Sequence, residues 1–555
     1  MRDYAMPFFP RAVRLFHTIR YLKPIQIFSR ITRRLHRIHP KVTDIPAIHL
    51  PKQSFCSPAR RHISLLDENQ AMFLNHTADI SSREIWNSKS FAKLWLYNLH
   101  YFDDLNARQA DQRTTWHDKL IRRWIDENPP GFGTGWEAYP LSLRIANWIK
   151  WVLAGNLLDD PVRVSLAVQC RYLYGSLETH LLGNHLFVNA KALLFGGLFF
   201  QGAEADKWYA TGLKIVSQQL PEQILADGGH FELSTMYHAL FLEDLLDLVN
   251  LHRAYNKSCP DALTNRIAPM LSWLRVISHP DGEISFFNDS AIGIAPSPEE
   301  VFSYATKLGF SEIDPLSVPL HDLPQSGYSR VALGPAVALI DRAAIGPDYL
   351  PAHAHADTLS FELSLYGFRF VVNCGTSVYQ DNAQRHLERS TQSHATVVID
   401  DENSSEVWSA FRVARRAHVF DHEIIEQDSE VSLQAAHDGY SRLPGKPKHN
   451  RRWEFTETEL KIIDRISGVG SHKVEVVLPL HPDIVIDTHK ESEVTLVVAD
   501  NRVRVGFSGH GRLRVDICGY HPGFGVSLPN TKLVYAVIAE LPLQIETSIR
   551  YDSCK

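Results

Sequence analysis

A short run of histidine and aspartate side chains offers the clearest chemistry in this sequence. His353, His355 and Asp357 occupy alternate positions, so in an extended segment all three lie on one side. Residues 359–365 alternate between apolar and polar side chains, which predicts that the run leads into an amphipathic β-strand. Because the chain contains 28 histidines, a structural hydrogen-bond network explains the run about as well as a functional site. A binuclear zinc hydrolase is disfavoured, since Thr358 stands where that motif requires another histidine.

The composition is that of an ordinary globular protein. A length of 555 residues predicts more than one domain, and a net charge of -6 gives no sign of a nucleic-acid partner. The six cysteines lack CxxC spacing, which predicts reduced thiols rather than disulfides or a thiolate zinc site. No apolar run near Met1 reaches the length of a signal-peptide core, and no run in the sequence approaches the length of a transmembrane span. We therefore expect a cytoplasmic or membrane-associated protein, with the periplasm as the alternative.

The first 60 residues form a separate basic segment. Residues 1–41 contain ten Lys or Arg and a single acid, Asp3. Apolar side chains are interleaved with the basic ones, as in Leu15, Phe16, Ile19 and Leu22 beside Arg14, Arg20 and Lys23. The pattern favours a helix packed on the main domain with solvated arginines. Peripheral contact with an anionic membrane or polymer is the alternative.

Two parts of the chain differ in hydrophobic period. From about residue 90 to 280 the apolar residues follow helical spacing, and short breakers such as 128–131 predict helical hairpins. After Tyr328 the period changes to two, with Pro and Gly turns between runs, which favours antiparallel sheets. We therefore predict a helical domain over residues 61–325 and a β-sheet domain over residues 326–555.

Three places in the helical part carry polar or aromatic groups of chemical interest. The glycine-rich loop at 131–139 presents Trp136 and Tyr139, which suit either stacking on a sugar ring or core packing. Asn184 and His185 begin an otherwise apolar helix, where Asn184 serves equally well as a helix cap. The third place, residues 229–238, carries a carboxylate and a phenol near the start of the next helix.

Read together, the motifs resemble the heparinase II/III and alginate-lyase superfamily of polysaccharide lyases over most of the chain. The resemblance rests on 183–185, Tyr237, 353–357, 373–376 and 393–394 in this order. It implies an α+β multidomain fold, in which an N-terminal incomplete (α/α) toroid is followed by a C-terminal antiparallel β-sandwich domain. It also implies a carbon-oxygen lyase that cleaves a uronic-acid glycan by β-elimination in the cleft between the domains.

The resemblance assigns roles to five catalytic residues. Asn184 and His185 neutralise the uronate carboxylate, so that the C5 proton becomes acidic enough to remove. Tyr237 and His353 transfer protons, and Tyr379 is a third candidate for that role. For glucuronate or mannuronate the proton and the leaving group share one face, so Tyr237 serves as base and acid. For iduronate or guluronate they lie on opposite faces, which brings in His353.

A structural zinc ion is also implied by the resemblance. Its ligands map to His355, Asn373 and His394, where family members have His, Asp and His. Because Asn373 offers only a neutral carbonyl oxygen, we expect weaker zinc binding, with Asp357 or water as a substitute ligand. A hydrogen-bonded network of Asn and His without metal is the alternative.

An acidic polysaccharide substrate also needs cations and aromatic rings around it. The predicted substrate-binding residues are Trp136, Tyr139, Arg144, Glu232, Arg385, Arg389 and Trp408. We expect a lyase acting on a uronate glycan, in a capsule or exopolysaccharide pathway. One alternative is a catalytically inactive glycan-binding or assembly protein, suggested by Asn373. Another is a glycoside hydrolase, which requires two paired carboxylates such as Glu137 and Asp227.

Overall fold

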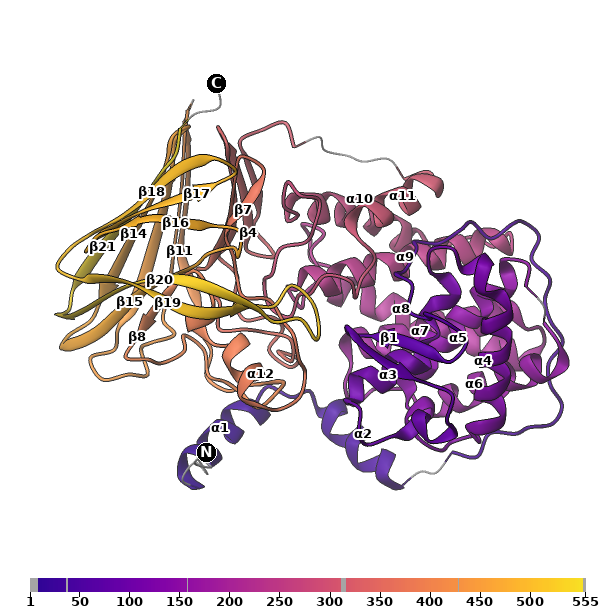
Figure 1. Ribbon diagram of the computed structural model, residues 1–555. Helices are drawn as coiled ribbons and strands as arrows, with labels where there is room; N and C mark the ends of the chain where they lie inside the picture. The colour runs from indigo at the N-terminus through magenta and orange to yellow at the C-terminus, as the bar shows by residue number, and fades with distance from the viewer. Residues whose placement is uncertain (1–7, 36–37, 157, 311–315, 428, 553–555) are drawn as a thin grey trace.

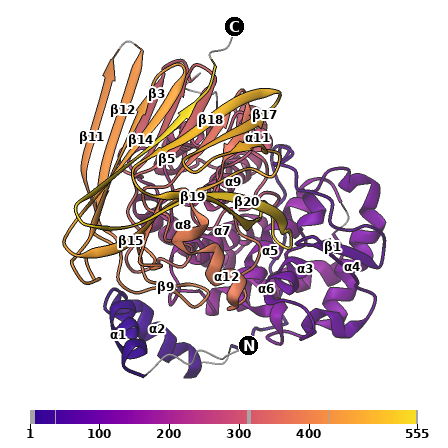
Figure 2. The same cartoon turned by 60° about the vertical axis from the view of Figure 1, so that its left-hand side comes forward.

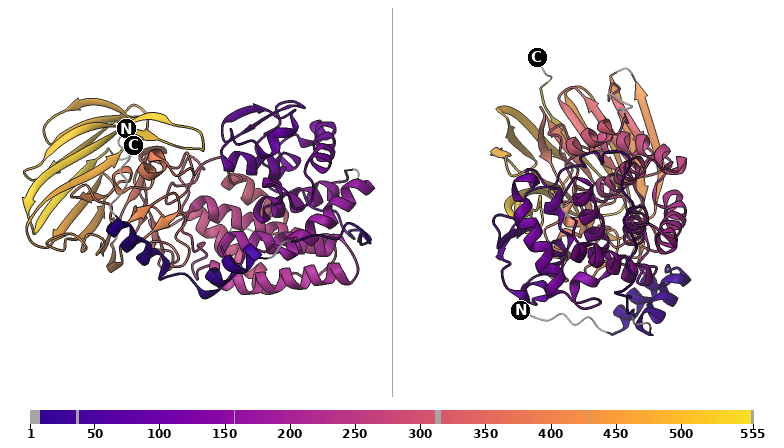
Figure 3. Two further views of the ribbon diagram at one scale, coloured as in Figure 1. Left: turned by 90° about the horizontal axis from the view of Figure 1, so that it is seen from below. Right: turned by 90° about the vertical axis from the view of Figure 1, so that its right-hand side faces the viewer.

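The computed structural model has a helical part and a β-sheet part that lie side by side (Figure 1). It describes residues 8–35, 38–156, 158–310, 316–427 and 429–552. Helices α1 (Phe8–Ile19) and α2 (Pro24–Leu35) lie beside both parts, α1 along the sheets and α2 along the helices (Figure 3, left). Among the described residues, no helix is both long and apolar enough to cross a bilayer.

The helical part is built from antiparallel helices around one apolar core. The helices are α3 (Lys93–Tyr101), α4 (Thr114–Glu127), α5 (Ala138–Leu153), α6 (Asp160–Gly175), α7 (Gly183–Phe199), α8 (Ala203–Gln223), α9 (Thr235–Ala254), α10 (Asp261–Val276) and α11 (Pro298–Lys307). Helix α7 is mostly apolar and is buried among α5, α8 and α9, with its Lys191 paired with Asp244 and Asp247 of α9. Its first turn, which carries Asn184 and His185, thereby has a fixed position.

Among the described residues, the β-sheet part contains three larger antiparallel sheets that share one apolar core, besides the two-stranded pair of β9 (Val407–Trp408) and β10 (Arg412–Val413). One sheet is formed by β3 (Leu320–Leu323), β4 (Tyr328–Leu333), β5 (Ala336–Asp341), β6 (Phe361–Leu365) and β7 (Phe368–Val371). A second contains β8 (Val397–Ile399), β15 (Ser471–Pro479), β19 (Arg512–Tyr520) and β20 (Leu528–Glu540). The third contains β11 (Val419–Gln427), β12 (Glu430–His437), β13 (Lys448–Phe455), β14 (Glu459–Ser467), β16 (Val485–His489), β17 (Glu493–Val498), β18 (Asn501–Ser508) and β21 (Leu543–Arg550). Figure 2 shows the strands of this large sheet lying over the smaller ones.

The strand predicted after the histidine run is present, but it is not amphipathic. Strand β6 is buried on both faces. Glu362 accepts hydrogen bonds from His279 and from the backbone of Phe286, and Ser364 also contacts His279. The polar positions are therefore satisfied inside the protein, which alternation of residue types alone does not reveal. His353 and His355 themselves lie in the loop between β5 and β6.

Candidate active site

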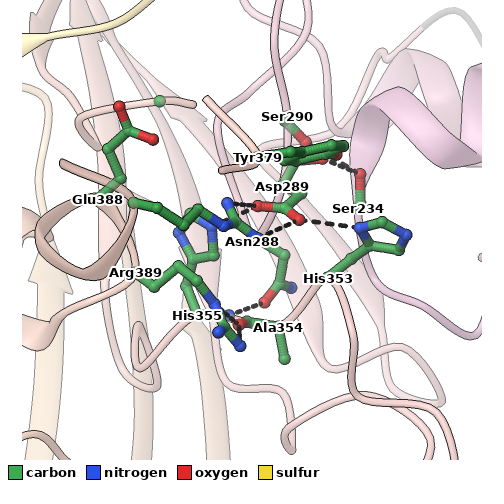
Figure 4. A network of polar contacts seen from close by, with 12 residues as sticks. Ser234, Asn288, Asp289, Ser290, His353, Ala354, His355, Tyr379, Glu388 and Arg389 are labelled. Carbon is green, nitrogen blue, oxygen red and sulfur yellow. Dashed lines mark hydrogen bonds and ion pairs between the residues drawn. The ribbon is translucent and has the colours of Figure 1, made fainter. Parts of the chain in front are cut away.

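The Asp289 carboxylate holds the centre of a buried polar cluster where the two parts meet (Figure 4). His353 Nδ1 donates to Asp289 Oδ2 at 2.8 Å, and His355 Nε2 donates to Oδ1 at 2.8 Å. The two terminal nitrogens of the Arg385 guanidinium, Nη1 and Nη2, also donate to this carboxylate, with Nη2 at 2.7 Å from Oδ2. Although burial opposes it, these partners hold the pKa of Asp289 well below its usual range. These partners therefore favour the ionised form of Asp289.

His353 is positioned to act as a base. Because Asp289 is ionised and only accepts, the proton of a neutral His353 sits on Nδ1 and Nε2 keeps its lone pair. The ring packs against that of Tyr237, with centroids 4.0 Å apart and planes tilted by 31°, and the hydroxyls of Tyr237 and Tyr379 are 3.2 Å apart. The His353 side chain is 13% exposed. One imidazole and two phenols thus meet at an accessible point.

Burial keeps both phenols protonated. Burial raises the pKa of Tyr237 well above its usual value, and Tyr379 adds to the effect. Burial likewise raises the pKa of Tyr379, reinforced by the Asp289 carboxylate. In the free protein each tyrosine is therefore a proton donor. To act as a base, Tyr237 needs a bound group that stabilises its phenolate.

Glu232 connects this cluster to the first turn of α7. Its Oε2 lies 3.7 Å from His353 Nε2 and has no hydrogen-bond partner among the described residues. Burial raises the pKa of Glu232, opposed by His353 and by the backbone amide of Asn184. The predicted convergence of Asn184, Tyr237 and His353 on one region is therefore present. Glu232 lies between them rather than on a substrate-facing wall.

The α7 side of the site contains an imidazole and an amide. His185 Nδ1 lies 3.2 Å from Glu178 Oε2, and the His185 ring is 4.5 Å from that of Tyr139. Burial lowers the pKa of His185, but the Glu178 carboxylate outweighs it and the net direction is upward. Asn184 Nδ2 donates to the Tyr139 hydroxyl at 3.4 Å. Asn184 is not the helix cap, because the cap position is Leu182.

Unusual backbone conformations surround the site. Leu182, Leu233 and Asn288 all have positive φ, of 67°, 58° and 55°. Each directly precedes or follows a site residue or its motif, and such conformations are costly for residues with a Cβ. They hold the loops in place, as when the Asn288 side chain accepts the backbone N–H of His355 at 2.9 Å. No periodic signal in the sequence reveals them.

Two predicted substrate contacts in the helical part are wrong. Trp136 is buried, donates to the backbone of Asn128 and packs on Trp124, so it belongs to the core. Arg144 is fully buried as well. Its guanidinium lies 3.8 Å from the Trp124 ring centre and binds Gln169 and two backbone carbonyls. Of this group only Tyr139, which contacts Asn184 and His185, lies at the site.

Three predicted contacts in the β-sheet part are also corrected. Arg385 is buried against Asp289, so it positions the carboxylate instead of binding substrate. Arg389 is buried and donates only to backbone carbonyls, including that of Ala354. Trp408 donates to Thr18 in α1 and lies under the N-terminal helices. Residue type and proximity to a motif could not distinguish these structural side chains from exposed ones.

The three predicted zinc ligands do not contain an anionic group. His355 Nε2 and His394 Nδ1 are occupied as donors, to Asp289 and to the Ser390 carbonyl. The remaining nitrogens, His355 Nδ1 and His394 Nε2, face each other at 3.1 Å with their lone pairs. Asn373 is buried and its Nδ2 has no partner among the described residues. Among the residues that the structure describes, no group of three or more His, Cys, Asp or Glu side chains is arranged to hold a metal ion.

The carboxylates of the hydrolase alternative have separate structural roles. Glu137 binds Lys93 and Tyr97 near the surface of the helical part. Asp227 accepts the backbone N–H groups of Gln325 and Ser326 and fixes the entry to the β-sheet part. With no partner in common, they do not form the pair that hydrolysis requires.

Sequence reasoning missed three residues of the site. Asp289 is the central carboxylate, and Glu178 sets the charge of His185. Ser234 caps α9 by accepting the Tyr237 N–H, and it donates to the Asp289 carbonyl at 2.6 Å. The Ser234 position two residues after Glu232 was a usable signal, because serine before a helix is a common cap.

Comparisons with known proteins agree with this geometry. Two family models match, Heparinase II/III N-terminus over residues 120–308 and Heparinase II/III-like, C-terminal over residues 315–551. A heparin-sulfate lyase of Pedobacter heparinus is 25% identical over 260 residues, covering 41% of this chain and 38% of that protein. FtsZ-localized protein C of Caulobacter vibrioides is 26% identical over 317 residues, covering 55% of this chain and 52% of that protein. The crystal structure of heparinase III has a TM-score of 0.70 at 19% identity, covering 85% of this chain and 79% of that one.

The chain is thus a toroid and β-sandwich protein with a polar site at the junction of its two parts. It belongs to the heparinase II/III-like family, whose two models together match most of its length. The similarity to heparinase III confirms the predicted fold class. The chain spans about half the length, or less, of the curated relatives it matches.

Proposed function

We propose that this protein is a polysaccharide lyase that cleaves a uronic-acid glycan by β-elimination. The observation that carries the proposal is the meeting of His353, Tyr237 and Tyr379 with the first turn of α7. The relatives named as heparin-sulfate lyases support the same reaction class. An acidic polysaccharide is the partner expected for such a site.

In this reaction the two sides of the site divide the work. Cationic His185 and the Asn184 amide bind the uronate carboxylate and stabilise the negative charge that develops there. A base removes the C5 proton, its electron pair forms the C4–C5 double bond, and the C4–O bond breaks. An acid then protonates the leaving oxygen, so no water is consumed.

The protonation states favour one assignment of acid and base. With its Nδ1 hydrogen-bonded to Asp289, the neutral form of His353 has a lone pair on Nε2, and Tyr237 carries a proton, so we assign His353 as base and Tyr237 as acid. This pairing suits iduronate or guluronate units, in which the proton and the leaving group lie on opposite faces. For glucuronate or mannuronate, Tyr237 fills both roles once cationic His185 and the bound substrate stabilise its phenolate.

The test is product chemistry on a panel of defined uronate oligosaccharides, with and without sulfate groups. Cleavage by β-elimination produces an unsaturated uronate with new ultraviolet absorbance and fragments whose summed mass equals that of the substrate. A gain of one water in that sum indicates hydrolysis and contradicts the proposal. Tyr237→Phe should lose the absorbance while keeping the native thermal unfolding temperature.

The predicted zinc site becomes a second part of the proposal. We infer that the facing lone pairs of His355 and His394 hold a zinc ion with the Asn373 carbonyl. Such an ion braces the loops of the β-sheet part and takes no part in proton transfer. Asn373→Asp should retain zinc at lower free metal concentration, as measured by mass spectrometry after dialysis against a chelator. His355→Gln should lose it, and zinc-free protein in all three forms would contradict the inference.

An inactive glycan-binding or assembly protein is the second candidate. FtsZ-localized protein C, a relative of comparable identity, carries a name that describes location rather than catalysis. For this candidate, an acidic glycan binds equally well to the wild type and to Tyr237→Phe, and neither protein cleaves it. Calorimetric binding measured beside the absorbance assay separates the two candidates.

A further inference from the structure

The two N-terminal helices are amphipathic, but they are oriented differently from ordinary surface helices, whose apolar sides face the protein. Their polar sides face the protein. In α2, buried Gln26 donates to the carbonyls of Leu181 and Tyr349, each at 3.4 Å, and Ser29 accepts from Thr179 at 3.0 Å. A helix that docks through its polar side leaves its apolar side without a partner.

Helix α1 is docked in the same way on the β-sheet part. Thr18 donates to the Val413 carbonyl at 3.3 Å and accepts from Trp408 Nε1 at 3.1 Å. Arg14 lies 3.6 Å from Glu406. The contacts of α1 and α2 therefore hold the helix pair across both parts of the molecule, with their polar sides inward.

The outward sides of both helices carry exposed apolar side chains, which together we call the N-terminal apolar face. Both helices present large side chains with the spacing i, i+1, i+4, which lies on one side of a helix. Its members are Leu15, Phe16, Ile19, Ile25, Ile27, Phe28 and Ile31, all more than 40% exposed. This concentration of apolar side chains within 17 residues is unlike the scattered single residues of a normal surface.

The charge around this face selects its partner. Residues 8–35 contain seven Lys or Arg and no Asp or Glu, and Arg20, Arg30 and Arg33 are exposed beside the apolar side chains. An anionic bilayer offers both phosphate groups for the cations and acyl chains for Phe16 and Phe28. A polyanionic glycan needs the cations alone. A second copy docked through the same face would bring like charges together.

We propose that the N-terminal apolar face docks this protein on the surface of an anionic membrane. The two helices lie in the headgroup region, with their apolar sides toward the acyl chains and the rest of the protein on the aqueous side. This goes beyond the proposed function and does not depend on it. It agrees with the peripheral membrane contact that the basic N-terminal segment suggested as an alternative.

The test is co-sedimentation of the full-length protein with vesicles of phosphatidylglycerol and phosphatidylcholine, or of phosphatidylcholine alone. We expect the protein to bind the anionic vesicles, with an affinity that falls as the salt concentration rises. The affinity of Phe16→Glu/Phe28→Glu should be at least tenfold lower than that of the wild type. The matched control is Phe132→Glu, because Phe132 is 66% exposed and Phe16 and Phe28 are each 64% exposed. The control should bind like the wild type, and thermal unfolding should show that all forms are folded.

Three outcomes would overturn the proposal. Equal binding by wild type and Phe16→Glu/Phe28→Glu would show that the face is not the contact. Absence of binding to anionic vesicles would exclude the membrane as its partner. A dimer in light scattering that the double substitution dissociates, without vesicle binding, would assign the face to a second copy of this chain.

Discussion

Two buried clusters in this molecule are built from the same three residue types but differ in their surroundings. Asp289 binds His353 and Arg385 at the junction of the two parts. Asp464 binds His449 and Arg451 inside the β-sandwich, with His449 Nε2 at 2.6 Å and Arg451 Nε at 2.7 Å. His449 is fully buried, whereas His353 reaches the surface beside two phenols. Exposure and neighbours, rather than residue type, therefore distinguish the histidine that we propose as a base from the buried one.

The largest expected effect comes from replacing the histidine of each cluster. His353→Gln should reduce kcat by about 10²–10⁴-fold, because a positioned acid or base contributes that much to proton transfer. His449→Gln should lower the unfolding temperature while leaving the activity per folded molecule unchanged. Initial rates on the cleaved uronate glycan, normalised to the folded fraction, check both. Equal loss of activity in the two variants would place both histidines in the same structural role.

The next comparison concerns the carboxylates. Asp289→Asn and Asp464→Asn each leave a buried arginine without its counter-charge, which should cost about 3–5 kcal/mol of unfolding free energy. Only Asp289→Asn should also lower kcat, since it releases the His353 proton from Nδ1. Denaturant unfolding gives the stabilities, and the rate assay at low temperature gives the activities. Retention of full activity in Asp289→Asn would show that Asp289 does not position His353.

The hydrophobic period of the sequence predicts part of the fold. The change of hydrophobic period from helical spacing to alternation follows from burial of one side of each element. The division into a helical part and a β-sheet part could therefore be predicted from the sequence. The outward orientation of the apolar sides of α1 and α2 could not be predicted, because periodicity identifies an apolar side without showing whether it faces the core. The same pattern fits a packed helix and a docked one.

The site was predicted less completely than the fold. His353 and Tyr237 stand in motifs, and their convergence could be expected from the family resemblance. Asp289 lies in an irregular loop whose position depends on positive φ at Asn288, which the sequence pattern does not specify. Arg144 and Arg385 were misassigned because an arginine's type does not show whether carbonyls or carboxylates already occupy its donors.

A smaller effect separates the clusters by their response to acid. Although burial opposes it, Arg451 and His449 lower the pKa of Asp464 to about 2. Since the folded pKa lies below the unfolded value, this stabilisation is present above about pH 4 and is lost as the pH falls toward 2. It amounts to about 2 kcal/mol at neutral pH. The unfolding temperature of Asp464→Asn should therefore fall less between pH 4 and pH 2 than that of the wild type; parallel curves would contradict this assignment.

The smallest effect tests a third carboxylate–histidine pair on the α7 side of the site, in which Glu178 is buried and the His185 side chain is 35% exposed. Glu178 raises the pKa of His185 against burial, so the imidazolium is present at low pH and is lost as the pH rises through the folded pKa. Glu178→Gln should move the alkaline limb of kcat/KM to lower pH and change the unfolding free energy by only about 1 kcal/mol. Glu137→Gln is the matched control, because it removes a carboxylate of the same part that contacts only Lys93 and Tyr97. If the pH profile of Glu178→Gln coincides with that of the control, the charge on His185 is not what binds the uronate, and recognition rests on the Asn184 amide.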